Sequence, residues 1–233
     1  MYPFFWFDPT MILLLPAIIF AMYAQGKVTS TFRRYLRVGS RSGYTGAQAA
    51  RNILDRNGLH DVRIEMIGGN LTDHYDPRSK VLRLSRNVYN GTSIASIGVA
   101  AHEAGHAIQH AKGYYPLILR NNIAPIASFS SRFVWFLIFA GLFIPGIEIF
   151  GFNLLHLGIL LYLAVIAFHV VTLPVEFNAS NRAIAQLEAG ILSREEIRPA
   201  KKVLNAAALT YVAATLTAIA QLMRLILISS RRD

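Results

Sequence analysis

The sequence predicts a mainly α-helical integral membrane protein in which about four transmembrane helices carry a small cytoplasmic α+β domain. Of its 233 residues, 54% are hydrophobic and only 15% are charged, and the mean hydropathy is positive, which is too apolar for an ordinary soluble domain. Long apolar stretches alternate with polar sequence along the chain. The net charge of +10 is concentrated in some of the polar connections, as is typical of membrane proteins.

The first apolar stretch covers residues 8–25 and is long enough to cross a bilayer as a helix. A cleaved secretory peptide is the alternative, but no basic segment precedes this stretch and no small-x-small cleavage site follows it. Polar sequence of mixed charge then runs through residues 27–120, which we expect to form the cytoplasmic domain.

This polar region contains two helix patterns and two strand patterns. The segment from Thr45 to Asn57 predicts a helix capped by its first threonine. Alternating residues predict strands at Val62–Ile67 and Val81–Ser85, which we expect to form a small antiparallel sheet around a polar turn at 68–80. Residues 92–111 begin with Thr-Ser, contain no proline and end before Lys-Gly, so they predict a longer helix.

The second half of the chain is predicted to hold three more membrane spans. One long apolar stretch carries only the charge of Glu148, within a turn rich in glycine and proline, so two helices at 125–147 and 152–174 fit better than one. A polar, basic segment at 176–205 follows as a loop or helix. The last apolar stretch, 206–228, predicts the fourth span.

The distribution of basic residues predicts the orientation of these spans. Residues 27–132 carry 15 Lys or Arg, residues 176–205 carry five, and the tail from Arg224 carries three. Because basic loops stay on the cytoplasmic side, we expect both polar segments there and both chain ends outside. The basic surplus then reflects topology and contact with anionic lipid, and no nucleic-acid partner is expected.

The helix predicted at 92–111 contains an HExxH sequence. His102 and His106 lie four residues apart, so on a helix both imidazoles can reach one Zn²⁺. Glu103 can then act as the general base for a zinc-bound water. The chain has no cysteine, so the remaining ligands of any metal must be His, Asp or Glu.

A catalytic zinc site needs a third protein ligand, and four residues are candidates: His110, Glu176, His74 and His169. His110 lies about 80° round the helix from the first zinc histidine and over about 10 Å along it, which is too far for one metal. A neutral histidine hydrogen-bonded between helices is the simpler interpretation of His169. Glu176 follows two spans after the HExxH helix, which returns it to the same membrane face.

Several polar residues could assist the reaction. His74 and Tyr75 lie in the predicted turn, where they could stabilise an oxyanion or be plain turn residues. Arg182 could stabilise the same charge or be an ordinary interfacial arginine. Asp73 and Asp76 are interpreted as turn formers. The strand before the HExxH helix, Val81–Ser85, is the candidate for binding an extended substrate along a sheet edge.

Three segments resemble one known family. Leu71–Arg78, Val99–Ala107 and Leu173–Arg182 are similar to the YugP-type membrane zinc metallopeptidases and, more distantly, to HtpX-like and CAAX prenyl proteases. The resemblance implies a bacterial membrane protein with a zincin-like domain of the gluzincin type, one catalytic Zn²⁺, and Glu176 as the third ligand. The distant relatives carry Asp four residues after that Glu. This chain has Ser180 there, so either the shell around the ligands is rebuilt or another residue supplies the contact.

The sequence therefore predicts a multi-pass zinc endopeptidase at the cytoplasmic face of the cell membrane, acting on peptides or proteins, including membrane proteins. One alternative is a site-2-type intramembrane protease. Asn122–Pro125 matches half of that class's second motif, but no Asp-Gly follows and the HExxH helix is too polar for a lipid-facing span. The other alternative is a non-catalytic scaffold or chaperone subunit that retains a zinc site. No oligomeric state is predicted.

Overall fold

The computed structural model describes residues 9–144, 148–149 and 152–231. The chain divides into two compact units, the first formed by 1–23, 119–173 and 211–233 and the second by 24–118 and 174–210. Asp8, at the start of the predicted first span, and Pro145, Gly146 and Gly151 of the predicted turn lie outside the described residues.

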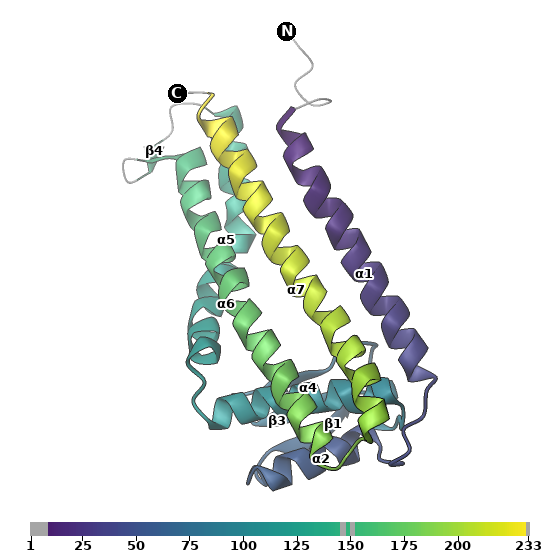
Figure 1. Cartoon of the computed structure of the whole chain (residues 1–233). Helices are drawn as coiled ribbons and strands as arrows, with labels where there is room; N and C mark the ends of the chain where they lie inside the picture. Colours follow the sequence, from purple (N-terminus) through teal and green to yellow (C-terminus); the bar gives the residue numbers. More distant parts are fainter. Residues whose placement is uncertain (1–8, 145–147, 150–151, 232–233) are drawn as a thin grey trace. The chain divides into compact units, whose positions relative to one another are not determined.

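Long helices dominate the described chain (Figure 1). A short 3-10 segment, Pro9–Leu14, leads into α1 (Leu15–Leu36), and the other long helices are α5 (Tyr115–Phe143), α6 (Leu154–Glu188) and α7 (Arg194–Ser229). Among the described residues, four helices are long and apolar enough to cross a membrane, which confirms the predicted number: Pro9–Leu36, Tyr115–Phe143, Leu154–Glu188 and Arg194–Ser229.

These helices extend well beyond the predicted spans. Helix α6 continues to Glu188 rather than ending at 174, α7 begins at Arg194 rather than at 206, and α5 begins at Tyr115 rather than at 125. Hydropathy marks only where a helix stops being apolar, whereas its backbone hydrogen bonds continue through polar sequence. The predicted polar segment at 176–205 is therefore mostly the polar ends of two long helices.

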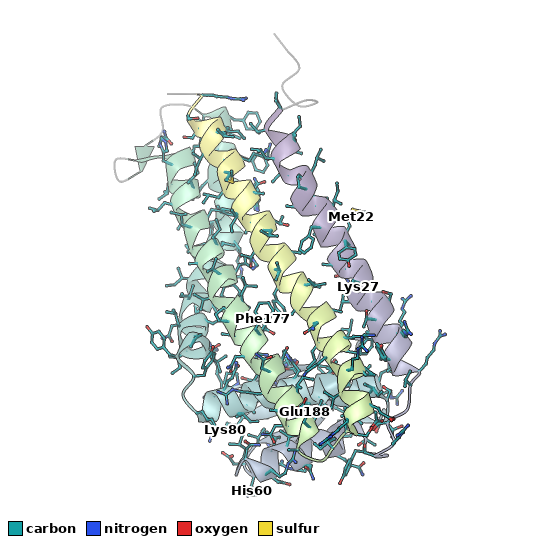
Figure 2. The ribbon with its side chains drawn as sticks, in the orientation of Figure 1. Met22, Lys27, His60, Lys80, Phe177 and Glu188 are labelled. Carbon is teal, nitrogen blue, oxygen red and sulfur yellow. The ribbon has the colours of Figure 1, made fainter. Side chains whose placement is uncertain are left out.

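The first unit packs three helices around a small apolar core. Half-buried apolar side chains surround this core. The buried side chains come from α5, α6 and α7: Val134, Ile138, Leu155, Tyr162, Ala218 and Leu225. Two short strands, β4 (Glu148–Ile149) and β5 (Phe152–Asn153), pair antiparallel between α5 and α6. Many large apolar side chains remain exposed, among them Met22 (Figure 2), as expected for helices that face lipid.

The second unit combines short helices with a three-stranded sheet. Helix α2 (Gly46–Arg56) has a capping box, in which the Thr45 hydroxyl accepts from the Gln48 amide and the Gln48 side chain accepts from the Thr45 amide. Helix α3 (Arg86–Tyr89) leads into α4 (Ile94–Ala111), whose first turn is capped by Ser93. The helices predicted from capping patterns thus begin within two residues of the predicted positions.

The sheet differs from the predicted antiparallel pair. Its order is β1-β3-β2, where β1 (Arg63–Ile67) pairs parallel with β3 (Val81–Ser85) and β2 (His74–Asp76) pairs antiparallel with β3. The predicted turn at 68–80 therefore contains a strand, and the prediction of an antiparallel pair was wrong. Three residues are too few to show alternation, so the true hairpin partner of β3 was invisible in the sequence.

The core of this unit joins segments that are far apart in sequence. Helix α4 packs against α2, β2 and β3. The same cluster of buried residues includes the polar end of α6 and the start of α7. Leu187, Ile191 and Leu204 belong to it together with Ile53 and Ile97. The segment 174–210 is therefore an integral part of the unit that contains α4.

Candidate metal centre

Three side chains from α4 and α6 converge in the second unit. Among the described residues, the group of histidine and acidic side chains that could hold a metal ion is His102, His106 and Glu176, whose ligand atoms all lie within 4.8 Å of one another. His102 Nε2 lies 3.2 Å from Glu176 Oε2, and His106 Nε2 lies 3.7 Å from the same oxygen. All three side chains are mostly buried.

The two separations to Glu176 fit a tetrahedral zinc ion. Two ligands bound at about 2.1 Å with a tetrahedral angle between them stand roughly 3.4 Å apart, and the distances of 3.2 and 3.7 Å lie on either side of that value. The two imidazole rings are nearly perpendicular, at 86°, with centroids 4.8 Å apart. Two histidines and one carboxylate form a donor set found in catalytic zinc sites, which leaves one position for water or substrate.

A glycine allows α6 to approach α4 at this point. A Cβ placed on Gly105 would lie 2.6 Å from the backbone oxygen of Ala179, which is on α6 three residues after Glu176. Such a distance is well inside van der Waals contact. The glycine of the HExxH sequence thus lets the helix with two histidines lie close to the helix with the carboxylate.

Gly105→Ala is expected to lower zinc affinity about tenfold or more and to destabilise the fold by about 1–3 kcal/mol, because the methyl group must displace backbone. Gly98→Ala is the matched control, since a Cβ at Gly98 of the same helix meets nothing within 4 Å. Both substitutions raise helix propensity equally. Zinc competition titrations and thermal melts of the two variants check the prediction, and equal zinc affinities would contradict it.

Gln109 determines which nitrogen of His106 faces the centre. It is buried, its Oε1 lies 3.0 Å from His106 Nδ1, and its Nε2 donates to the Val175 carbonyl at 2.8 Å and to Asn178 Oδ1 at 3.0 Å. A carbonyl can only accept, so the amide orientation is fixed and Oε1 accepts the proton of His106 Nδ1. With its Nδ1 proton held by Gln109, His106 directs Nε2 toward Glu176, which is the orientation a metal ligand requires.

Ser180 contacts His102 as Gln109 contacts His106. Its hydroxyl lies 3.2 Å from His102 Nδ1, and it is on α6, one turn after Glu176. A hydroxyl can accept the Nδ1 proton and so leave Nε2 for a metal. Ser180 therefore contacts one of the two predicted histidine ligands through a neutral hydroxyl group.

Glu103 lies beside this trio in a buried position. The pKa of its carboxyl is raised to about 7, chiefly by burial and in smaller part by the nearby carboxylates of Glu176 and Asp73, although His102 and the Tyr75 backbone amide act in the opposite direction. A carboxyl whose pKa lies near neutrality is suited to exchange protons at physiological pH. A bound Zn²⁺ would add positive charge and favour the ionised form.

The remaining predicted residues are placed as follows. His74 lies on β2, is exposed, and its Nδ1 donates to the Thr72 carbonyl at 2.8 Å. Strand alternation puts it on the opposite sheet face from Tyr75, whose hydroxyl lies 2.9 Å from His110 Nδ1. Arg182 donates to Asn178 Oδ1 at 2.7 Å and lies over the ring of Tyr114. None of these residues joins the described group of possible metal ligands.

Two earlier assignments change. Strand β3 is central and paired on both sides, so the prediction that Val81–Ser85 offers a free sheet edge was wrong. Asp73 is more than a turn former, because its carboxylate accepts from the Ser85 amide at 2.7 Å and from the Ser85 hydroxyl at 3.1 Å. Gln109 was missed, although a glutamine three residues after a predicted ligand lies on the same helix face and could have been considered.

The whole chain is similar to proteins described as zinc metallopeptidases or membrane proteases. A family model described as "Putative neutral zinc metallopeptidase" matches residues 10–230. The "Putative membrane protease YugP" of Bacillus subtilis (strain 168) is 46% identical over 217 residues, which cover 93% of this chain and 94% of that protein. No solved structure matches the chain.

Proposed function

Since the chain belongs to the neutral zinc metallopeptidase family, we propose that it is a membrane-embedded, zinc-dependent endopeptidase whose reaction takes place beside α4. The observation that carries the proposal is the convergence of His102, His106 and Glu176 within 4.8 Å, next to the buried carboxyl of Glu103. Family membership supplies the reaction class, and this geometry supplies the residues.

His102, His106 and Glu176 would hold one Zn²⁺. When bound, the ion would polarise the carbonyl of the scissile peptide bond and make water a stronger nucleophile at neutral pH. Gln109 and Ser180 hold the two imidazoles by their Nδ1 atoms, so that both Nε2 atoms face Glu176. Hydrogen bonds to Nδ1 of this kind orient the imidazole of a metal-binding histidine.

Glu103 would move the proton. Its carboxylate accepts a proton from the attacking water as the oxygen bonds to the carbonyl carbon. The carbon–nitrogen bond then breaks, and Glu103 returns the proton to the leaving amine. The second proton of the water passes from the new carboxylic acid to the amine, so the products are a carboxylate and an ammonium group, and Glu103 is again ionised for the next turnover.

Strand β2 is a better candidate than β3 for substrate binding. In the described chain β2 pairs with β3 alone, and the Tyr75 amide is directed to Glu103 rather than to β3. An extended peptide could donate backbone hydrogen bonds to the outward carbonyl of this edge, which would bring the peptide past the general base. Backbone hydrogen bonds are the same for every peptide sequence, so any preference among substrates must come from contacts with their side chains.

The basic polar segments support a site at the cytoplasmic face of the membrane, where peptides and membrane proteins are available as substrates. A site-2-type intramembrane protease is less well supported, because α4 is not among the four candidate membrane helices found in the described residues. A non-catalytic scaffold would bind zinc but would not cleave peptides, so a measurement of peptide cleavage distinguishes it from an endopeptidase.

The purified protein in detergent is expected to carry about one zinc per chain and to cleave unfolded protein or peptide mixtures. Removal of the metal with a strong chelator should abolish cleavage, and added Zn²⁺ should restore it, because the ligand trio has no other means of activating water. Metal analysis and mass spectrometry of the products check both steps. Zinc bound without cleavage of any component would favour the scaffold.

A further inference from the structure

A cavity of about 250 Å³ opens on the second unit beside β2 and the last two turns of α4. Four apolar side chains form its wall: Leu59, Val62, Ala107 and Ala111. Asp61 and Lys80 lie at its border and form an ion pair at 2.6 Å (Lys80 is labelled in Figure 2). The cavity is separate from the trio of possible metal ligands.

The cavity and the proposed general base share one face of α4. Ala107 lies one turn after Glu103, and His110 follows it on the same side of the helix. Along the helix axis, Ala107 lies about 6 Å and His110 about 10 Å from Glu103. An extended peptide covers these distances with about two and three residues. The cavity is therefore within reach of a substrate whose scissile bond lies at Glu103.

Tyr75 connects the two places. Its backbone amide contacts Glu103, whereas its ring lines the cavity and its hydroxyl lies 2.9 Å from His110 Nδ1. Burial, with Asp61 and Asp76 nearby, raises the pKa of Tyr75 to about 12, so the phenol stays neutral at physiological pH. The hydrogen bond to His110 fixes the position of the Tyr75 ring and therefore the width of the cavity. Tyr75 belongs to β2, the strand that would bind the substrate backbone.

The size and lining indicate the kind of occupant. Pockets for drug-sized ligands begin at about 300 Å³, so a cavity of about 250 Å³ suits a single large side chain. Its wall is apolar, and the charges at its border already neutralise each other. A Leu, Met or Phe side chain matches this lining, and a charged one does not.

We propose that this cavity is a specificity pocket for one large apolar side chain of an extended substrate, two or three residues from the scissile bond. The proposal rests on the proposed endopeptidase function. It adds that one apolar residue of the substrate determines where the substrate is cleaved. Because β2 would bind any peptide backbone equally, this pocket is where the sequence of the substrate is distinguished.

Pocket variants of the full-length protein test the proposal. Ala111→Phe fills the cavity from an exposed position, and Leu59→Ala enlarges it. Lys112→Phe is the matched control, because it adds the same ring one residue outside the lining. Cleavage of a complex peptide library, read by mass spectrometry, gives the preference at each substrate position without knowledge of the natural substrate.

Wild type and Lys112→Phe are expected to prefer Leu, Met or Phe at one position. Ala111→Phe should lower kcat/KM for those peptides about tenfold or more while peptides with Gly or Ala there are spared. Leu59→Ala should shift the preference toward larger residues. Binding of the preferred peptides to Glu103→Gln, with and without Ala111→Phe, gives a readout independent of turnover.

Identical preferences in all four proteins, with zinc content unchanged, would overturn the pocket proposal and leave the peptidase intact. A wild-type protein that cleaves no peptide would instead overturn the proposed function. Loss of cleavage in Ala111→Phe for every peptide, without loss of zinc or of folding, would also contradict a role limited to one substrate side chain.

Discussion

Glu103→Gln is expected to lower the rate of peptide hydrolysis by about 10²–10⁴-fold while zinc remains bound. Glutamine has nearly the same shape but can neither accept the proton of the attacking water nor deliver one to the leaving amine. The three possible metal ligands are untouched. Zinc analysis and kcat for a peptide found in the library screen measure the two properties on one preparation.

A second measurement tests the environment of the same residue. The unfolded chain ionises a glutamate near pH 4.3, whereas burial raises the pKa of Glu103 to about 7 in the folded, metal-free protein. The folded state then holds this proton more tightly, so stability falls as the pH rises from about 4.3 to 7. Zinc-free Glu103→Gln should therefore melt above zinc-free wild type at pH 8, and this difference should shrink toward pH 5. Equal melting temperatures at pH 8 would contradict the buried-carboxyl interpretation.

Glu176→Ala is expected to reduce zinc affinity by more than about 100-fold and to abolish hydrolysis at ordinary zinc concentrations. Two histidines alone leave the ion with half of its tetrahedral ligands, and the negative charge that balances it is lost. Equilibrium dialysis against a competing chelator, followed by metal analysis, gives the affinity.

The same helix provides a control for Glu176→Ala. Glu188 is half-exposed on α6 and lies 3.6 Å from Lys201 (Glu188 is labelled in Figure 2), so Glu188→Ala removes a carboxylate without touching the centre. Glu176→Asp adds a further point, since a shortened carboxylate should recover part of the affinity. Full zinc occupancy in Glu176→Ala at limiting zinc would exclude Glu176 as a ligand.

Local patterns in the sequence predicted much of this site. The spacing of His102, Glu103 and His106 fixes their arrangement once a helix forms, because residues four apart share a face. Capping residues located the starts of α2 and α4. Glu176 depended on a topological argument and a resemblance, and the structure brings it to 3.2 Å from His102. Its role as a ligand remains a prediction.

Features that depend on long-range packing were not predictable in the same way. Strand β2 has three residues, which show no periodicity, and whether β3 was central or at an edge depended on that missed strand. Gln109 has no motif, and its importance follows only from the approach of Val175 and Asn178, which are 66 and 69 residues away. The spacing of Gln109 from His106 could have suggested a shared helix face, but its contacts to α6 are properties of tertiary structure and leave no local signal.

The distance in sequence between the two halves of the metal centre affects the life of the chain before it is complete. His102 and Glu176 are 74 residues apart, so a ribosome has made the whole HExxH helix long before the third ligand exists. Domains form as units when their last segment has been synthesised. A nascent or truncated chain that ends before α6 has neither Glu176 nor Ser180. Under the proposed function, such a chain would bind zinc poorly and would not hydrolyse peptides, so activity would begin only after α6 is in place.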